Sequence, residues 1–181
     1  MLVSQTIQLR AIEEEDLLQI VQWRNLPEVN AYFYEFEPLS LTMQERWFSK
    51  FLGSTDKMWI VETIDEKKLL GTVSIYNIDM RSRKAEWGRL YLVGDVRSKG
   101  YGKEVSQLIY DYCFNHLNLN KLSCEVFADN VSVVEMHKKV GNKVEGTLRQ
   151  HVYRFGKYQD IVRLSILKEE WLENNPNKDN N

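Results

Sequence analysis

Residues 92–112 decide the fold, and they read Leu-Val-Gly-Asp-Val-Arg-Ser-Lys-Gly-Tyr-Gly-Lys-Glu-Val-Ser-Gln-Leu-Ile-Tyr-Asp-Tyr. An apolar strand pattern over 89–93 leads into a short polar turn over 97–102 that contains two glycines. Apolar residues from Val105 to Tyr112 then recur at the i, i+3, i+4 and i+7 positions of an amphipathic helix. Because backbone N–H groups and the positive end of a helix dipole meet at such a turn, the segment predicts a phosphate site.

The spacing within the turn separates three kinds of phosphate loop. A P-loop needs Ser or Thr after its lysine, whereas Lys103 is followed by Glu104. A dinucleotide fingerprint needs a third glycine at the position of Val105. The remaining match is Arg/Gln-x-x-Gly-x-Gly over 97–102, the pyrophosphate loop of the GNAT acetyltransferases, which the segment resembles. An ordinary surface turn that caps a helix is the alternative for the hexapeptide alone.

The resemblance implies a binding site for acetyl-CoA. In that family the loop amides bind the pyrophosphate, the preceding strand splays to hold the pantetheine arm, and an Asn that opens a later helix touches the same region. Asn130 opens such a helix here, although it could equally be a simple N-cap. The cofactor-binding residues so implied are Leu90, Tyr91, Leu92, Val93, Arg97, Ser98, Lys99, Gly100, Tyr101, Gly102 and Asn130.

The composition predicts one cytoplasmic domain. With 181 residues, 43% of them apolar, we expect a single domain over 1–172 and a flexible polar tail over 173–181. A net charge of -2 leaves no footprint of nucleic-acid binding. Cys113 and Cys124 lack the spacing of metal ligands and read as buried thiols in a reducing compartment, so no metal is expected. No signal-peptide pattern or long apolar run predicts export or membrane insertion.

The periodicities predict the order β-α-α-β-β-β-α-β-α-β-β. Three consecutive strands before the glycine turn imply an antiparallel meander. Together with the later strands, they predict a mixed, mostly antiparallel twisted sheet with helices on both faces. This is an α+β fold, and its order is similar to that of GNAT proteins from about residue 5 to 172. The expected strands are 5–10, 59–62, 69–78, 85–93, 122–127, 144–153 and 158–167, and the expected helices are 13–23, one opened by a Thr42–Glu45 capping box, 101–117 and 130–140.

Further motifs indicate a branch of the family. Residues 145–149 and 156–160 resemble the terminal hairpin of the branch with ribosomal-protein N-terminal, spermidine and nucleotide-linked amino-sugar acetyltransferases. The segment Trp-Arg-Asn-x-Pro over 23–27, with Trp171, looks most like the amino-sugar members. The chain departs from the family at Asn142, where an aromatic residue is usual.

The same resemblance suggests the catalytic groups. Glu86, in a segment that matches the start of the family's fourth strand, is the candidate base for the amine, unless it is a solvated or ion-paired carboxylate. His137 stands where many members carry a tyrosine that protonates the departing thiolate, a task that imidazole can perform. A solvent-facing helix histidine is the alternative. Backbone N–H groups over 90–93 are the candidates for stabilising the oxyanion.

The acceptor-binding candidates lie mostly in the loop after the first helix. Glu35 and Glu37 would bind a cationic amine, or they are surface acids. The loop aromatics, Tyr34 among them, would stack on a sugar or base, although half of them are expected in the core. Arg24 would bind the phosphates of a sugar nucleotide, and Tyr153 of the hairpin is a further pocket candidate.

The expected function is acetyl-CoA-dependent N-acetylation of a small-molecule amine, with a nucleotide-linked amino sugar as the first choice of acceptor. A polyamine such as spermidine and a protein N-terminus are the alternatives within enzymes, and a non-catalytic coenzyme A-binding module is the alternative outside them. A sugar nucleotide predicts a basic patch near Arg24, whereas spermidine predicts an acidic pocket around Glu35, Glu37 and Glu86. Pairing of the terminal hairpin could form a homodimer.

Overall fold

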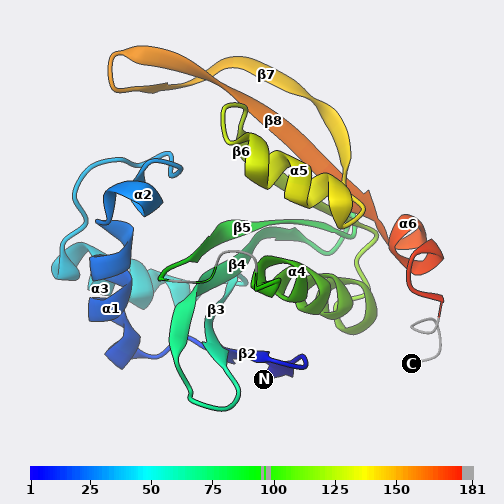
Figure 1. Ribbon diagram of the computed structural model, residues 1–181, viewed down its shortest axis with the longest axis horizontal. Coiled ribbons are helices and arrows are strands. Elements are labelled where there is room, and N and C mark those ends of the chain that lie inside the picture. The colour runs from blue at the N-terminus through cyan, green and yellow to red at the C-terminus, as the bar shows by residue number, and fades with distance from the viewer. Residues whose placement is uncertain (95, 97–98, 177–181) are drawn as a thin grey trace. The chain divides into compact units, whose positions relative to one another are not determined.

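The computed structural model describes residues 1–94, 96 and 99–176, and its elements follow the chain in Figure 1. Within these residues the strands are β1 (Leu2–Val3), β2 (Ile7–Ala11), β3 (Lys57–Thr63), β4 (Leu69–Asp79), β5 (Lys84–Leu92), β6 (Lys121–Phe127), β7 (Lys143–Arg154) and β8 (Lys157–Leu167). The α-helices are α1 (Leu17–Arg24), α2 (Pro27–Asn30), α3 (Leu41–Phe51), α4 (Tyr101–Asp111), α5 (Val131–Lys139) and α6 (Lys168–Glu173).

The strands are hydrogen-bonded in the order β1-β2-β3-β4-β5-β6-β8-β7. The pairs β1–β2, β2–β3, β3–β4, β6–β8 and β7–β8 are antiparallel, and β5 pairs with β6 in parallel. The predicted α+β class with a mixed, mostly antiparallel sheet is therefore confirmed. Strand β1 and helices α2 and α6 were not predicted from the sequence.

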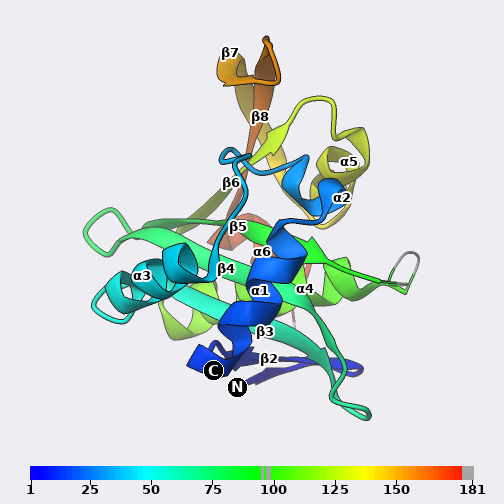
Figure 2. The ribbon, with the colours of Figure 1, turned by 90° about the vertical axis from the view of Figure 1, so that its left-hand side faces the viewer.

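Contacts divide the chain into two compact units, and the first contains Met1–Tyr76 and Arg89–Val105. Its core forms where the apolar sides of α1 and α3 pack on strand residues such as Ile60 and Tyr91. Strands β3 and β4 are buried at almost every position along long runs, so both of their faces are covered. Figure 2 shows α1, α3 and the loop that joins them through α2. This loop carries the predicted acceptor-binding residues.

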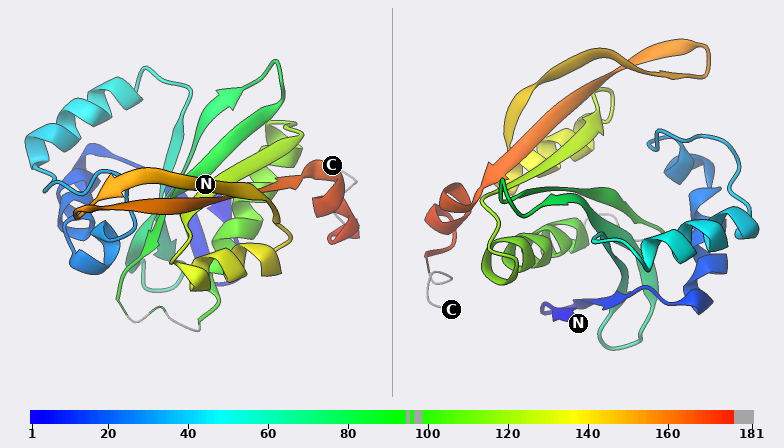
Figure 3. Two further views of the ribbon diagram at one scale, coloured as in Figure 1. Left: turned by 90° about the horizontal axis from the view of Figure 1, so that it is seen from above. Right: turned by 180° about the vertical axis from the view of Figure 1, so that it is seen from behind.

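The second unit contains Asn77–Gly88 and the chain from Ser106 to the C-terminus. Its core buries Trp87, Phe114 and Trp171 completely, and the rings of Phe114 and Trp171 lie 5.4 Å apart. Figure 3 shows its long β7–β8 hairpin from above and from behind. Cys113 and Cys124 are both free and buried, which confirms the prediction of buried thiols. The predicted single domain over 1–172 with a tail stays a prediction.

One predicted helix cap was wrong, and one predicted helix changes its type near its end. Helix α3 is capped by Ser40, whose hydroxyl accepts a hydrogen bond from the Met43 N–H at 3.3 Å, and not by a Thr42 capping box. The helix predicted over 101–117 ends as α-helix at Asp111 and continues as one π-helical turn over Tyr112–His116. Among the described residues, no helix is long and apolar enough to cross a membrane.

Candidate active site

Strand β5 changes direction at Arg89, after its pairing with β6 has ended. The parallel ladder covers only the pairs from Lys84–Lys121 to Glu86–Ser123, although both strands continue further. Arg89 has a φ of +48°, a left-handed conformation that is rare for a residue with a side chain. An irregularity of this kind bends a strand, so the residues after it run in a different direction. The main chain of 90–93, the predicted pantetheine-binding segment, comes directly after this bend.

Contacts with β4 hold the bent segment in place. The Thr72 hydroxyl donates a hydrogen bond to the Arg89 carbonyl at 3.0 Å, and the Val93 N–H donates to the Leu70 carbonyl at 2.7 Å. A Cβ atom at Gly71 would lie 1.9 Å from the Tyr91 carbonyl oxygen, so only glycine fits between the two strands. The backbone of this segment is therefore fixed before any ligand binds, as preorganised catalysis requires.

The side chain of Tyr91 belongs to the core of the first unit. Its ring packs edge-on against Trp23 at 6.1 Å and against Phe33 at 5.7 Å between centroids. Burial raises the pKa of the Tyr91 phenol to about 12. Only the main chain of Tyr91 is thus available to a ligand, which agrees with the backbone role that the sequence predicts for it.

The N-terminus of α4 has the features of an anion site. Gly100 has a φ of +80° and precedes the helix, and its carbonyl accepts the N–H groups of Lys103 and Glu104. A Cβ atom at Gly100 or Gly102 would meet no atom of the described residues within 4 Å, so these residues leave space open beside this backbone. The helix dipole favours a phosphate here, and the residues fit the diphosphate of coenzyme A. The predicted contacts of Arg97 and Ser98 lie outside the described residues.

Glu86 is half-buried in β5 and faces a cation. Its Oε1 lies 3.4 Å from Nη2 of Arg163 in β8, and Nη1 of the same guanidinium lies 3.5 Å from Oε1 of Glu125 in β6. Both distances are long for an ion pair, and one arginine serves two carboxylates. Glu86 is therefore ion-paired, as one of the two alternatives from the sequence has it. Its role as the base stays a prediction.

His137 is buried in the second unit. Its imidazole is 4% exposed and packs edge-on against Trp87, with ring centroids 5.1 Å apart, and its Nδ1 lies 3.6 Å from Sγ of Cys124. Burial lowers the pKa of His137 to about 4. The solvent-facing alternative was wrong. The predicted role as a proton donor stays a prediction, and burial in a neutral form favours a packing role instead.

The two asparagines that flank α5 have different surroundings. Asn130 stands at the N-cap position, but its side chain makes no capping hydrogen bond and accepts one from the Ser132 hydroxyl at 3.2 Å. Asn142 is buried, and its amide donates hydrogen bonds to the Tyr110 hydroxyl and to the His137 carbonyl. At the position of the usual aromatic residue, Asn142 thus has a hydrogen-bonded NH₂ group, whereas its buried Oδ1 has no hydrogen-bond partner among the described residues.

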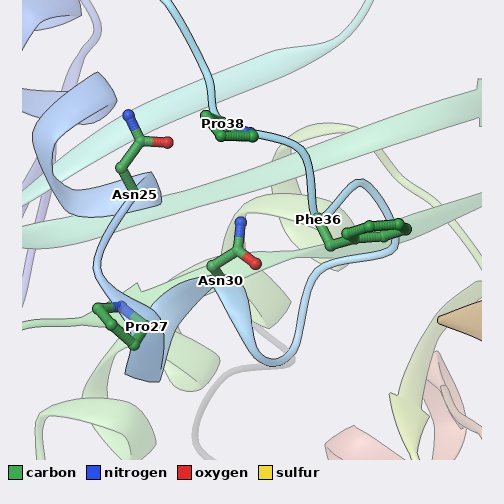
Figure 4. A pocket seen from close by; sticks show the side chains of 5 residues that line it. All are labelled: Asn25, Pro27, Asn30, Phe36 and Pro38. Carbon is green, nitrogen blue, oxygen red and sulfur yellow. The ribbon is translucent and has the colours of Figure 1, made fainter. Parts of the chain in front are cut away.

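The loop between α1 and α3 presents the acceptor-binding candidates. Glu35 and Glu37 are exposed, and Tyr34 is partly exposed. The guanidinium of Arg24 instead lies 3.4 Å above the ring of Phe33, and desolvation lowers the pKa of Arg24. A hollow of about 210 Å³ lies in this loop. Figure 4 shows the side chains that line it, from Asn25, Pro27, Asn30, Phe36 and Pro38.

Tyr153 lies near the end of β7, in the second unit. It is 61% exposed, and its ring centroid lies 5.0 Å from that of Tyr158 across the hairpin. This contact explains the position of Tyr153 by cross-strand packing alone. Its predicted place in the acceptor pocket stays a prediction.

Sequence reasoning missed one neighbour of the predicted site residues in each unit, Gly71 beside the backbone of Tyr91 and Arg163 beside Glu86. Gly71 sits inside an apolar strand, and a single glycine in a strand is a known signal of close backbone approach. Arg163 gives no such signal, because its partner Glu86 is 77 residues away in the chain.

Comparison with known proteins defines the class. Residues 6–143 match the model of the acetyltransferase (GNAT) domain, and the chain belongs to this family. It is 28% identical over 171 residues to spermidine N(1)-acetyltransferase of Vibrio cholerae, covering 94% of this chain and 98% of that protein. The Escherichia coli enzyme of the same name is also 28% identical over 171 residues, covering 93% and 90%.

A solved structure gives the same picture. Spermidine N-acetyltransferase from Vibrio cholerae, in complex with CoA and spermine, superposes with a TM-score of 0.85 at 29% identity, covering 92% of this chain and 98% of that one. The family resemblance predicted from the sequence is thus confirmed. The chain is an N-acetyltransferase of the GNAT family that uses acetyl-CoA as its co-substrate.

Proposed function

We propose that the acceptor is a polyamine of the spermidine class. The observation that carries this proposal is the charge of the segment from residue 25 to 45, which holds four glutamates, at positions 28, 35, 37 and 45, and no lysine or arginine. Among the described residues, Glu35 and Glu37 have no ion-pair partner within 4 Å and are exposed. Exposed carboxylates on one loop, of which Glu35 also interacts electrostatically with Arg24, attract a flexible polycation and concentrate it near the site.

The surroundings of Arg24 disfavour a nucleotide-linked amino sugar, the first-choice acceptor, as the substrate. That acceptor needs a cation for its phosphates, and Arg24 is the one predicted to supply it. Its guanidinium is stacked on Phe33, partly desolvated, and attracted electrostatically to Glu35 and Tyr91. Two relatives are named for spermidine acetylation, which supports the polyamine alternative better than the amino sugar.

The proposed reaction is direct transfer. The neutral primary amine attacks the thioester carbonyl, the C–N bond forms, and the C–S bond breaks to release the coenzyme A thiolate. Glu86 takes the proton that the amine loses, directly or through water, and solvent protonates the thiolate. Backbone N–H groups in 90–92, next to the Val93 N–H that the Leu70 carbonyl already engages, stabilise the developing oxyanion.

In this proposal, coenzyme A binds to the same backbone segment and to the start of α4. The segment after the bend at Arg89 holds the pantetheine arm, and the N-terminus of α4 at Gly100 and Tyr101 holds the diphosphate. Lys99 and Lys103 add positive charge at this point. Asn130, whose amide is not engaged in capping, contacts the arm from α5.

The experiment is a thiol-release assay with acetyl-CoA and spermidine at two ionic strengths. Attraction by exposed carboxylates predicts that the KM for spermidine rises several-fold between about 0.05 and 0.5 M salt, because charges separated by more than the Debye length are screened. The kcat should change little. Release of thiol with no dependence on spermidine concentration would refute the proposal.

A further inference from the structure

The carboxylate of Glu104 is bound by two hydroxyl side chains of the N-terminal turn. Glu104 lies in the first turn of α4, and Ser4 and Thr6 lie between β1 and β2 in the same unit. The Ser4 hydroxyl donates a hydrogen bond to Oε2, and the Thr6 hydroxyl donates one to Oε1 at 2.8 Å. The Thr6 N–H also lies 3.3 Å from Oε2. Both carboxylate oxygens are thereby directed at this turn.

The turn itself is held in place by the sheet. The Ser4 hydroxyl oxygen accepts a hydrogen bond from the Ile7 N–H at 3.2 Å, and the Ser4 N–H donates to the Ile7 carbonyl at 2.9 Å. The Ile64 N–H donates to the Thr6 carbonyl at 3.0 Å. The donors that bind Glu104 are thus fixed on β2. The bound carboxylate has little freedom to swing towards the start of its own helix.

We propose that Ser4 and Thr6 are positioning residues for the cofactor site, because they hold the Glu104 carboxylate away from the coenzyme A diphosphate. This inference rests on the proposed place of the diphosphate at the N-terminus of α4. A carboxylate in the first turn is favourable to the helix dipole, but it repels a second anion at the same end. Three hydrogen bonds also spread its negative charge over their donors, which reduces this repulsion.

The test measures CoA binding by calorimetry on the full chain. Ser4→Ala/Thr6→Val removes both hydroxyl donors at nearly constant volume, and the Kd for CoA should rise about five-fold at low ionic strength. Most of the difference should disappear near 1 M salt, where the Debye length falls to about 3 Å. Adding Glu104→Gln to the double variant should restore the Kd, because the freed side chain is then neutral. Thr42→Val/Ser49→Ala on α3 is the matched control.

Two outcomes would overturn the inference. One is an unchanged Kd in Ser4→Ala/Thr6→Val. The other is a raised Kd that survives both high salt and Glu104→Gln, which would show a packing effect and not a charge effect. Lys103→Glu tests the underlying site separately. If this variant binds CoA as tightly as the wild type, the diphosphate placement fails as well; if it binds weakly while the double variant does not, only the role of Ser4 and Thr6 fails.

Discussion

The imidazole of His137 lies edge-on against the indole of Trp87, with the ring centroids 5.1 Å apart and the planes at 73°. The two residues pack inside the second unit, where α5 supplies the histidine and β5 the tryptophan. A charged imidazolium at this place would have little access to water. The histidine is therefore kept neutral in the folded protein.

This burial predicts a specific loss of stability in acid. The pKa of His137 is lowered to about 4 in the folded state from 6.5. Between these values the unfolded chain binds a proton that the folded chain does not, so stability falls as the pH falls. The difference of about 2.5 units corresponds to roughly 3 kcal/mol of the free energy of unfolding. Urea unfolding at pH 7 and pH 4.5 measures it.

The matched comparison uses two histidine variants. His137→Phe should lose less stability than the wild type between the two pH values, because only the wild type has the buried histidine. A part of the loss remains in both proteins, since carboxylates titrate in both. His151→Asn, on exposed β7, should behave as the wild type does. Equal pH dependence in all three proteins would contradict the buried, neutral state. A kcat for His137→Phe within about ten-fold of the wild type would support the packing role over proton donation.

Glu86 offers a test of the proposed base. Glu86→Gln should lower kcat by about 100-fold and leave the Kd for CoA unchanged, because the amine would lose its proton acceptor. Glu125→Gln, which removes the other carboxylate beside Arg163, should affect kcat far less. Steady-state kinetics with spermidine measures both. Equal activity of the two variants would leave Glu86 with a structural ion pair only.

The acidic loop should determine acceptor affinity. Glu35→Gln/Glu37→Gln should raise the KM for spermidine about ten-fold, with little change in kcat or in CoA affinity, since two carboxylates that attract the cation are lost. Glu14→Gln/Glu15→Gln, at two exposed positions before α1, is the control for net charge. The idea fails if the control variant raises the KM as much as the loop variant does.

The close approach of β4 to β5 predicts that substitution of Gly71 strongly destabilises the protein. Gly71→Ala would place a methyl group 1.9 Å from the Tyr91 carbonyl oxygen, so the strands must separate, at a cost of several kcal/mol in the free energy of unfolding. Gly146→Ala in β7 meets no atom within 4 Å and should change stability by less than about 0.5 kcal/mol. Thermal unfolding of both variants measures this difference. Similar unfolding midpoints would contradict the prediction and show that β4 can move away from β5 at little cost.

Local patterns predicted most of the fold. The helix that starts at Tyr101 and the strand that ends near Val93 each carry their own periodicity, so their positions follow from nearby residues. The cap of α3 was misplaced because Ser40 and Thr42 are both good N-cap residues, and the choice depends on where the chain enters the helix.

The candidate site was harder to predict because its contacts are distant in the chain. His137 precedes two lysines and looks like a surface residue, but Trp87 and Cys124 from other elements bury it. The partnership of Arg24 with Phe33 likewise depends on how the loop folds back. The role of the backbone at 90–93 stays a prediction, but it rests on local sequence alone, because the strand leads directly into a glycine turn.

The most direct measurement is a competition for acetyl groups. The protein is incubated with acetyl-CoA and an equimolar mixture of spermidine, a nucleotide-linked amino sugar and a peptide with a free N-terminus, and mass spectrometry identifies the products. Acetylated spermidine as the main product, diminished in Glu35→Gln/Glu37→Gln, is the predicted result. Acetylation of the sugar nucleotide or the peptide with spermidine left unmodified would contradict the assignment of a polyamine acceptor.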